Sequence, residues 1–180
     1  MGNFEEAYYN IAFDVEEKEN EVAIRTKIAL GGPANPPIIK MDVDYIFLSD
    51  GSFDVKIDGK IRENAPVLPR LGLELYLNEE NENIRYFGLG EIETYPDRNK
   101  GAKYGMYELS VTDNFVHYIR PQENSSHFAT REVTVGEKGS VALNVKCNGI
   151  KDFSFNASHY SAMQLTDKQH DFELEKEPYT

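Results

Sequence analysis

The feature that most restricts the fold of this chain is an alternation of apolar and polar residues with a period of two. In the segment 21–30, every even position carries an apolar residue or threonine, whereas the odd positions carry charged residues or alanine. The segment 38–48 repeats the pattern, with Ile39, Met41 and Val43 alternating with Lys40 and Asp42. Successive side chains of a β-strand point to opposite faces of a sheet, so both segments are predicted to be strands buried on one side.

Turn residues separate the apolar runs at short intervals. Gly31-Gly32-Pro33 ends the first run, and Ser49-Asp50-Gly51-Ser52 predicts a hairpin because Asp-Gly suits the positive φ of a tight turn. Asp58-Gly59 is predicted to close the next strand or to mark a bulge. The remaining strands are predicted over residues 53–57, 71–77, 84–89, 107–111, 115–120, 127–135, 141–147 and 153–156. About ten short strands with this spacing predict an all-β protein, an antiparallel sandwich or barrel.

One short helix is predicted near residues 161–168. Ser161 and Gln164 fit a capping box, in which the serine hydroxyl accepts a backbone N–H and the glutamine side chain reaches back. The length of 180 residues suits one domain or two very small ones. We expect a single β-sandwich domain over residues 1–180.

Composition and charge exclude several classes of function. The net charge of −12 argues against nucleic acid or an anionic membrane as a partner, since both require a basic surface. The single cysteine, Cys147, is predicted to be a buried thiol of the β core, and it excludes a disulfide within the chain. No run of residues is apolar enough to cross a membrane, and no signal peptide is visible, so a cytoplasmic location is expected.

Common cofactor motifs are missing from the sequence. Gly88-Leu89-Gly90 is followed by Glu93 where a nucleotide-binding loop has its third glycine, and no helical pattern follows. The four histidines lack the spacing of a zinc site. We therefore expect no cofactor and no metal ion bound to this chain.

The first candidate functional segment is a polar loop directly after the strand 84–89. It carries Glu93, Tyr95, Asp97 and Arg98, and loops held by a rigid sheet often carry function. Its carboxylates could act as acid and base on a glycoside. Alternatively, Asp97 and Arg98 tie the loop down while Tyr95 packs beneath it.

A second polar segment contains Gln122 and Glu123, and Arg131 follows it closely. We expect most of the candidate residues of both segments to form a charge-assisted hydrogen-bond network that holds the long loops against the sheet.

Five motifs in a fixed order resemble a known family. They are Phe87-Gly88-Leu89-Gly90, Glu93-Thr94-Tyr95-Pro96-Asp97-Arg98, Pro121-Gln122-Glu123-Asn124, Thr130-Arg131-Glu132 and Phe153-Ser154-Phe155-Asn156-Ala157-Ser158-His159-Tyr160-Ser161. The series resembles the C-terminal domain of the β-galactosidases of glycoside hydrolase family 2, which also occurs in the small chain of two-chain β-galactosidases. The resemblance covers roughly residues 66–175, with a looser match from about residue 8 to 65.

The resemblance implies an antiparallel β supersandwich similar to that of galactose mutarotases. It implies a parent enzyme that hydrolyses terminal β-D-galactosides such as lactose with retention, assisted by magnesium and sodium on a separate catalytic domain. No carboxylate of this chain matches the catalytic motifs of the family, so no catalytic residue is carried over. The expected partners are the remaining domains or the large chain, the galactoside in the full enzyme, and a possible second copy.

The resemblance also indicates a fragment. Family members extend upstream and downstream into elements that contact the substrate, including a tryptophan, and this chain has no tryptophan. Within the motifs, Glu91-Ile92 replaces a Pro-Gln pair seen in some members, and Ser125 stands where glycine often follows Asn124.

Two alternatives to a supporting domain remain open. A free-standing carbohydrate-binding sandwich needs an aromatic platform, for which the candidates are Tyr86, Phe87, Tyr95 and Tyr104. A mutarotase-like epimerase needs a histidine acid and a glutamate base, for which His127 with Glu123 or Glu93 is the candidate pair.

Overall fold

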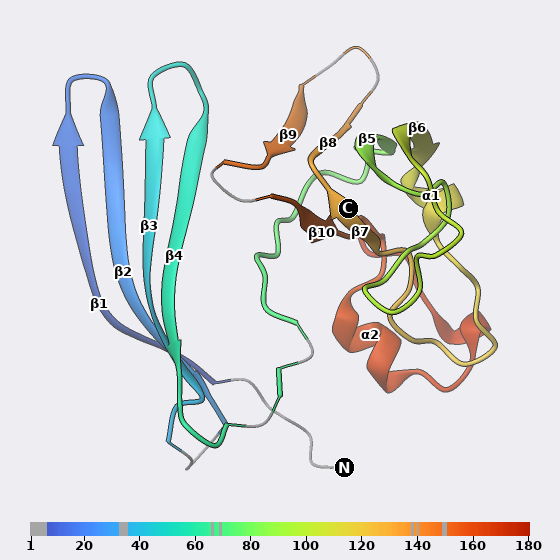
Figure 1. Ribbon diagram of the computed structural model, residues 1–180, viewed down its shortest axis with the longest axis horizontal. Helices are drawn as coiled ribbons and strands as arrows, with labels where there is room; N and C mark the ends of the chain where they lie inside the picture. The colour runs from blue at the N-terminus through green and yellow to red at the C-terminus, as the bar shows by residue number, and fades with distance from the viewer. Residues whose placement is uncertain are drawn as a thin grey trace. The chain divides into compact units, whose positions relative to one another are not determined.

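A computed structural model describes residues 7–32, 36–65, 67–68, 70–137, 139, 141–148 and 151–180, and the side chains from residue 12 onward. The chain divides into two compact units, Met1–Gly72 and Leu73–Thr180, each of which is described by itself (Figure 1). The expectation of one domain over residues 1–180 stays a prediction.

The first unit contains one four-stranded antiparallel sheet. Its strands are β1 (Ala7–Lys18), β2 (Glu21–Gly31), β3 (Ile39–Leu48) and β4 (Phe53–Ile61), and they lie side by side in chain order (Figure 1). The predicted hairpin between β3 and β4 is confirmed. Gly51 has a φ of +86°, and its N–H donates to the carbonyl of Leu48 at 3.0 Å.

The prediction that Asp58-Gly59 closes β4 or marks a bulge is wrong. The strand continues in unbroken register through Gly59, which lies opposite Met41, to Ile61. A Cβ at Gly59 would come within 3.0 Å of the Met41 side chain, so the glycine makes room for a neighbouring side chain. Strand β1 was not predicted from the sequence.

The second unit contains a four-stranded antiparallel sheet and a separate two-stranded one. The larger sheet has the order β6-β5-β8-β9, built from β6 (Tyr104–Ser110), β5 (Asn83–Leu89), β8 (Glu132–Gly136) and β9 (Ala142–Lys146). The smaller sheet pairs β10 (Phe153–Phe155) with β7 (His127–Thr130). The core of this unit is formed by Ile84, Tyr86, Val111, Val133, Val135 and Ala157.

The segment 127–135 forms two strands where one was predicted. Ala129 has a φ of +59°, and Arg131 lies between β7 and β8. Because β7 pairs with β10 whereas β8 pairs with β5 and β9, the chain passes from one sheet to the other at this point. A period-two pattern does not show such a change of partner.

Two other predicted strands are wrong. The segment 71–77 has an alternating pattern but lies outside the described sheets, with Leu71, Leu73 and Leu75 about half exposed and Leu77 hydrogen-bonded to Thr180. The segment 115–120 is irregular, because the Val116 N–H is bonded to a side chain, Asn124 Oδ1, at 3.1 Å.

The helical elements are short. They are α1 (Val111–Asn114), α2 (Ala162–Asp167) and the 3-10 turn η1 (Asp171–Glu173). The predicted cap of α2 is confirmed, since Ser161 Oγ accepts from the Gln164 N–H at 3.2 Å. The Gln164 side chain bonds instead to the carbonyl of Glu175 and to Glu177.

The predicted all-β, antiparallel fold class is confirmed, and the ten strands found in the described ranges are consistent with a β-sandwich. None of the helices in the described ranges has the length and apolar character needed to cross a membrane.

Candidate functional site

Two glycines shape the end of β5, from which the first candidate loop leaves. A Cβ at Gly88 would come within 2.7 Å of Thr130 Oγ1 and 3.1 Å of Thr130 Cα, so β7 can approach only a glycine at this position. Gly90 has a φ of +89°, which favours glycine, and its carbonyl accepts the buried hydroxyl of Tyr86. The Gly-Leu-Gly sequence therefore has a packing role at the start of the loop.

Thr94 fixes the loop to the chain that enters β7. Its N–H donates to the carbonyl of Ser126 at 2.7 Å, and its hydroxyl accepts the N–H of Phe128 at 2.9 Å. The Thr94 side chain is also within hydrogen-bond distance of the Leu89 carbonyl, at 3.1 Å. These bonds hold the neighbouring residue, Glu93, over the segment 124–126.

The Glu93 carboxylate is the centre of the site, and its side chain is only 8% exposed. Oε2 accepts the Ser125 N–H at 2.7 Å and the Tyr95 hydroxyl at 3.1 Å. Oε1 accepts the Tyr118 hydroxyl and the Arg98 guanidinium, which also forms an ion pair with it. Four donors from three separate chain segments therefore converge on one carboxylate, and we call these residues the Glu93 cluster.

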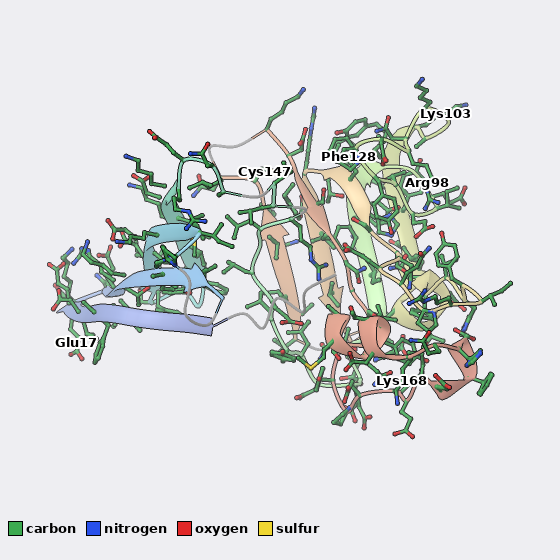
Figure 2. The ribbon with its side chains drawn as sticks, turned by 90° about the horizontal axis from the view of Figure 1, so that it is seen from below. Glu17, Arg98, Lys103, Phe128, Cys147 and Lys168 are labelled. Atoms are coloured by element: carbon green, nitrogen blue, oxygen red, sulfur yellow. The ribbon has the colours of Figure 1, made fainter. Side chains whose placement is uncertain are left out.

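Arg98 forms the outer layer of the Glu93 cluster. Its guanidinium lies 4.9 Å from the centre of the Tyr95 ring, and Nη1 donates to the Tyr118 hydroxyl at 3.4 Å. The backbone groups of Tyr95 and Arg98 exchange two hydrogen bonds, of 3.0 and 3.1 Å, which close the loop into a tight turn. The Arg98 side chain itself is 57% exposed and reaches the surface (Figure 2).

The electrostatics of the Glu93 cluster favour fixed protonation states. Burial raises the pKa of Glu93, but hydrogen bonds from Tyr118, Ser125 and Arg98 outweigh it and hold that pKa below its ordinary value. Burial, together with the Glu93 charge, raises the pKa of the Tyr95 hydroxyl. A general acid or base works best with a pKa near the operating pH, and these shifts move both groups away from it. The arrangement is suited to holding loops together.

Three residues important for the Glu93 cluster were not predicted: Tyr118, Ser125 and Asn114. Ser125 has a φ of +62°, and its hydroxyl donates to the Asn114 carbonyl at 2.6 Å. This left-handed conformation explains why glycine suits the position after Asn124 in the motif. The serine in place of glycine after Asn124 could therefore have indicated that Ser125 has a special backbone conformation. Tyr118 gave no such indication, because it lay in a segment predicted to be a strand.

His127 is completely buried, which contradicts its candidate role as an acid in a mutarotase-like site. Its ring lies 4.5 Å from that of Tyr86 and 5.0 Å from that of Phe155, and Nε2 lies 2.8 Å from Asn114 Oδ1. Desolvation lowers the pKa of His127 to about 4, although the negative charge of Glu93 acts to raise it. A sugar cannot reach this imidazole without opening the core.

The other candidate residues lie outside the Glu93 cluster. Asp97, Gln122 and Glu123 are exposed. The alternative in which Asp97 and Arg98 tie the loop down over Tyr95 is confirmed for Arg98, which pairs with Glu93 and lies over the Tyr95 ring. The Arg131 guanidinium lies 5.3 Å from the Tyr104 ring centre and 5.9 Å from that of Phe87.

The four rings proposed as a carbohydrate platform do not form one. Tyr86 is fully buried in the core, and the guanidinium of Arg98 lies over Tyr95. Phe87 and Tyr104 lie near each other, with ring centres 5.9 Å apart, but Arg131 lies over both. No flat, uncovered aromatic surface for a sugar ring is formed by these four residues.

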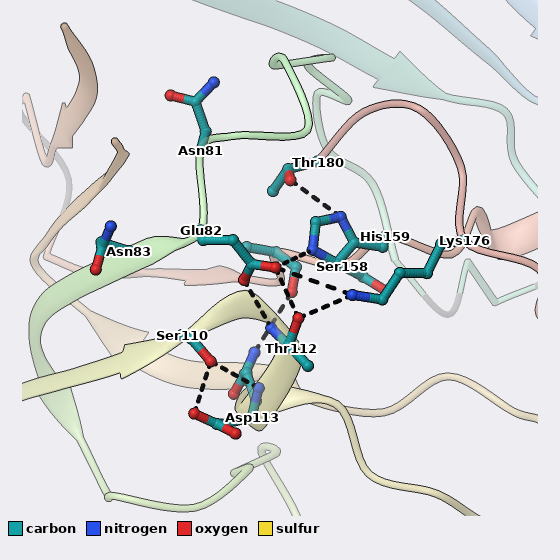
Figure 3. Close-up of polar contacts among 12 residues, drawn as sticks. Asn81, Glu82, Asn83, Ser110, Thr112, Asp113, Ser158, His159, Lys176 and Thr180 are labelled. Carbon is teal, nitrogen blue, oxygen red and sulfur yellow. Dashed lines mark hydrogen bonds and ion pairs between the residues drawn. The ribbon is translucent and has the colours of Figure 1, made fainter. Parts of the chain in front are cut away.

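A second polar cluster, which the sequence analysis did not predict, is centred on Glu82 (Figure 3). The imidazole of His159, 4% exposed, lies with Nε2 2.8 Å from Glu82 Oε1 and Nδ1 3.2 Å from Thr180 Oγ1. Glu82 also accepts the N–H and hydroxyl of Thr112 at 3.0 and 2.7 Å, and Lys176 donates to that hydroxyl at 3.0 Å. The cluster ties the C-terminal residues to β5 and α1.

Cys147 is partly buried just after β9, and burial raises the pKa of its thiol, which does not favour a reactive thiolate. In the part of the chain that the structure describes, no group of three or more histidine, cysteine, aspartate or glutamate side chains is arranged to hold a metal ion.

Comparison with known proteins identifies relatives of this chain. A family model described as "Beta galactosidase small chain" matches residues 3–180. The chain is 36% identical over 168 residues to a β-galactosidase of Lactococcus lactis subsp. lactis and 34% identical over 168 residues to one of Staphylococcus xylosus. It is 30% identical over 174 residues to a β-galactosidase of Actinobacillus pleuropneumoniae. These matches cover 92%, 93% and 96% of this chain, but 16%, 17% and 17% of the relatives, respectively.

Proposed function

This chain belongs to the beta galactosidase small-chain family, and we propose that it acts as a non-catalytic part of a β-galactosidase. The full enzyme would hydrolyse terminal β-D-galactosides such as lactose with retention, using catalytic groups and metal ions outside this chain. The chain would support the mouth of the active site or a subunit interface. The relatives are named β-galactosidases, and this chain spans about one sixth of their length.

The observation that carries the non-catalytic role is the state of Glu93. Retaining hydrolysis needs two carboxyl groups about 5–5.5 Å apart on either side of the sugar, one of them able to donate a proton. Glu93 already accepts four hydrogen bonds and its side chain is 8% exposed. A carboxylate in that state is held as an anion and is not available to attack a sugar.

The proposal is tested first with the chain alone. We expect no hydrolysis of o-nitrophenyl β-D-galactopyranoside above the uncatalysed rate, and no heat on titration with galactose or lactose. A hydrolysis rate that disappears in the Glu93→Gln variant would refute the non-catalytic role. Heat of binding in the absence of hydrolysis would favour the carbohydrate-binding alternative.

The second test uses the full-length β-galactosidase that carries this chain. Glu93→Gln should lower its thermal stability and leave the shape of the pH profile of kcat unchanged, because Glu93 connects loops and does not transfer a proton. The matched control is Glu91→Gln, an exposed carboxylate in the same loop, which should change neither quantity. A displaced limb of the pH profile for Glu93→Gln alone would indicate a catalytic role.

A further inference from the structure

The tight turn between β3 and β4 contains an aspartate followed by a glycine, Asp50-Gly51 (Figure 1). This pair of residues is chemically labile, because the main-chain nitrogen of a glycine is not hindered by a side chain and can attack the carboxyl group of the preceding aspartate. The hairpin therefore contains a position at which the main chain is open to a spontaneous modification.

The modification converts aspartate to isoaspartate in two balanced steps. The Gly51 nitrogen forms a bond to Asp50 Cγ while the Cγ–OH bond breaks, and the amide proton leaves with that hydroxyl as one water molecule. The product is a succinimide ring. Water then adds to the ring, and when it cleaves the bond between the main-chain carbonyl carbon of Asp50 and the nitrogen, the main chain runs through Cγ and is one atom longer.

An extra main-chain atom would disturb the hairpin, because the length of a tight turn sets the register of the two strands that it joins. The Leu48 N–H donates to the Ser52 carbonyl at 2.9 Å, which closes the turn. Next to it, Phe47 lies opposite Phe53, and their ring centres are 5.7 Å apart. The register of β3 and β4 therefore depends on an unmodified Asp50.

Three hydrogen bonds engage the two reacting groups. Asp50 Oδ1 accepts the Ser52 N–H at 2.9 Å and the Ser52 hydroxyl at 2.6 Å. The Gly51 N–H, which belongs to the attacking nitrogen, donates to the Leu48 carbonyl at 3.0 Å. Ring closure has to turn the carboxyl carbon of Asp50 onto the Gly51 nitrogen, so the reaction competes with these bonds.

The bonds from Ser52 also keep the carboxyl group ionised. The hydroxyl bond has the largest effect and the N–H bond the next largest, and together they hold the pKa of Asp50 below its ordinary value. A protonated carboxyl group can lose water during ring closure, whereas an ionised carboxylate repels the attacking nitrogen and has no neutral leaving group. Ser52 therefore opposes the reaction through both geometry and charge.

We propose that Asp50-Gly51 is a site of isoaspartate formation that the Ser52 hydroxyl protects in the folded chain. This proposal is independent of the proposed function. A second pair of the same kind, Asp58-Gly59, provides an internal comparison, because it lies within β4 in unbroken register with β3. Loss of the Ser52 hydroxyl should therefore affect position 50 and leave position 58 unchanged.

Incubation of the 180-residue chain at neutral pH in water labelled with heavy oxygen tests the proposal, because each ring opening adds one labelled oxygen. Trypsin cleaves after Lys56, which places the two Asp-Gly pairs in separate peptides for mass spectrometry. We expect Ser52→Ala to take up label at position 50 at least about threefold faster than the wild type, since a hydrogen bond to a charged group is lost.

Two control variants separate the role of this hydroxyl from a general effect on the turn. Ser52→Thr, which keeps a hydroxyl, should react at the rate of the wild type. Ser49→Ala, which removes a serine hydroxyl that is not a donor to Asp50 Oδ1, should also react at that rate. In urea that unfolds the chain, the wild type and Ser52→Ala should react equally fast, because the protection comes from the fold.

Equal rates of label uptake at position 50 in the folded wild type and the folded Ser52→Ala variant would overturn the proposal. An equal rise at position 58 in that variant would also overturn it, because the effect would then not be specific to the turn. A wild type that reacts as fast when folded as in urea would show that the three hydrogen bonds give no protection.

Discussion

Burial of His127 predicts an acid-dependent loss of stability of the second unit. Asn114 Nδ2 faces the carbonyls of Ser125 and Ala157, so its Oδ1 is the acceptor for the His127 Nε2–H, and Nδ1 carries the lone pair. Nδ1 has no hydrogen-bond partner among the described residues. The fold therefore accommodates neutral imidazole, and a second proton would introduce an unpaired buried charge.

The magnitude follows from the pKa difference between the unfolded and folded chains. The pKa of His127 falls from 6.5 to about 4 on folding, so the unfolded chain binds this proton more tightly. The contribution of His127 to the free energy of unfolding is fully present above pH 6.5 and is lost as the pH falls toward about 4. Below about pH 4 this contribution does not change further. Each pKa unit corresponds to about 1.4 kcal/mol, so the total loss is about 3 kcal/mol. Between about pH 7.5 and pH 5.5 the loss is about 1.4 kcal/mol.

Urea unfolding followed by circular dichroism at these two pH values measures the effect. The reference is His127→Phe, which keeps a ring between Tyr86 and Phe155 but cannot titrate. All other titrating groups contribute to both proteins, so the stability advantage of the wild type should shrink by about 1.4 kcal/mol at the lower pH. An advantage that is the same at both pH values would refute the argument that the fold excludes the protonated imidazole.

Three further predictions concern stability. Gly88→Ala should cost about 1–3 kcal/mol in thermal or urea unfolding, because its Cβ would meet Thr130 backbone, whereas Gly101→Ala, with nothing within 4 Å, should change stability by less than about 0.5 kcal/mol. Ser125→Ala should cost about 1–3 kcal/mol through loss of its hydrogen bond to Asn114. Ser125→Gly should cost about 1 kcal/mol less than the alanine variant, because glycine relieves the positive φ; equal losses would contradict this. Glu93→Gln should cost about 1.5–3 kcal/mol, measured in the isolated chain, since charge-assisted bonds to a buried carboxylate are lost.

The local pattern of the sequence predicted much of the fold. Alternation in 21–30 and 38–48 predicted β2 and β3, Asp50-Gly51 predicted the hairpin, and Ser161 predicted the start of α2. These features depend on residues close in the chain, where side-chain direction, turn geometry and capping are fixed by local stereochemistry. The order of five motifs also indicated the family, which the match over residues 3–180 confirms.

Only the tertiary structure decided which polar residues meet. Glu93 receives the N–H of Ser125, 32 positions away, and the hydroxyl of Tyr118, 25 positions away, and no local pattern encodes either pairing. The segment 127–135 became two strands because its two halves pair with different partners. The period of the sequence pattern indicates which side of a strand is apolar, whereas the partner of a strand depends on the free energy of packing the whole chain. This packing decided that Glu93 is a buried carboxylate that connects loops and that His127 is a core residue.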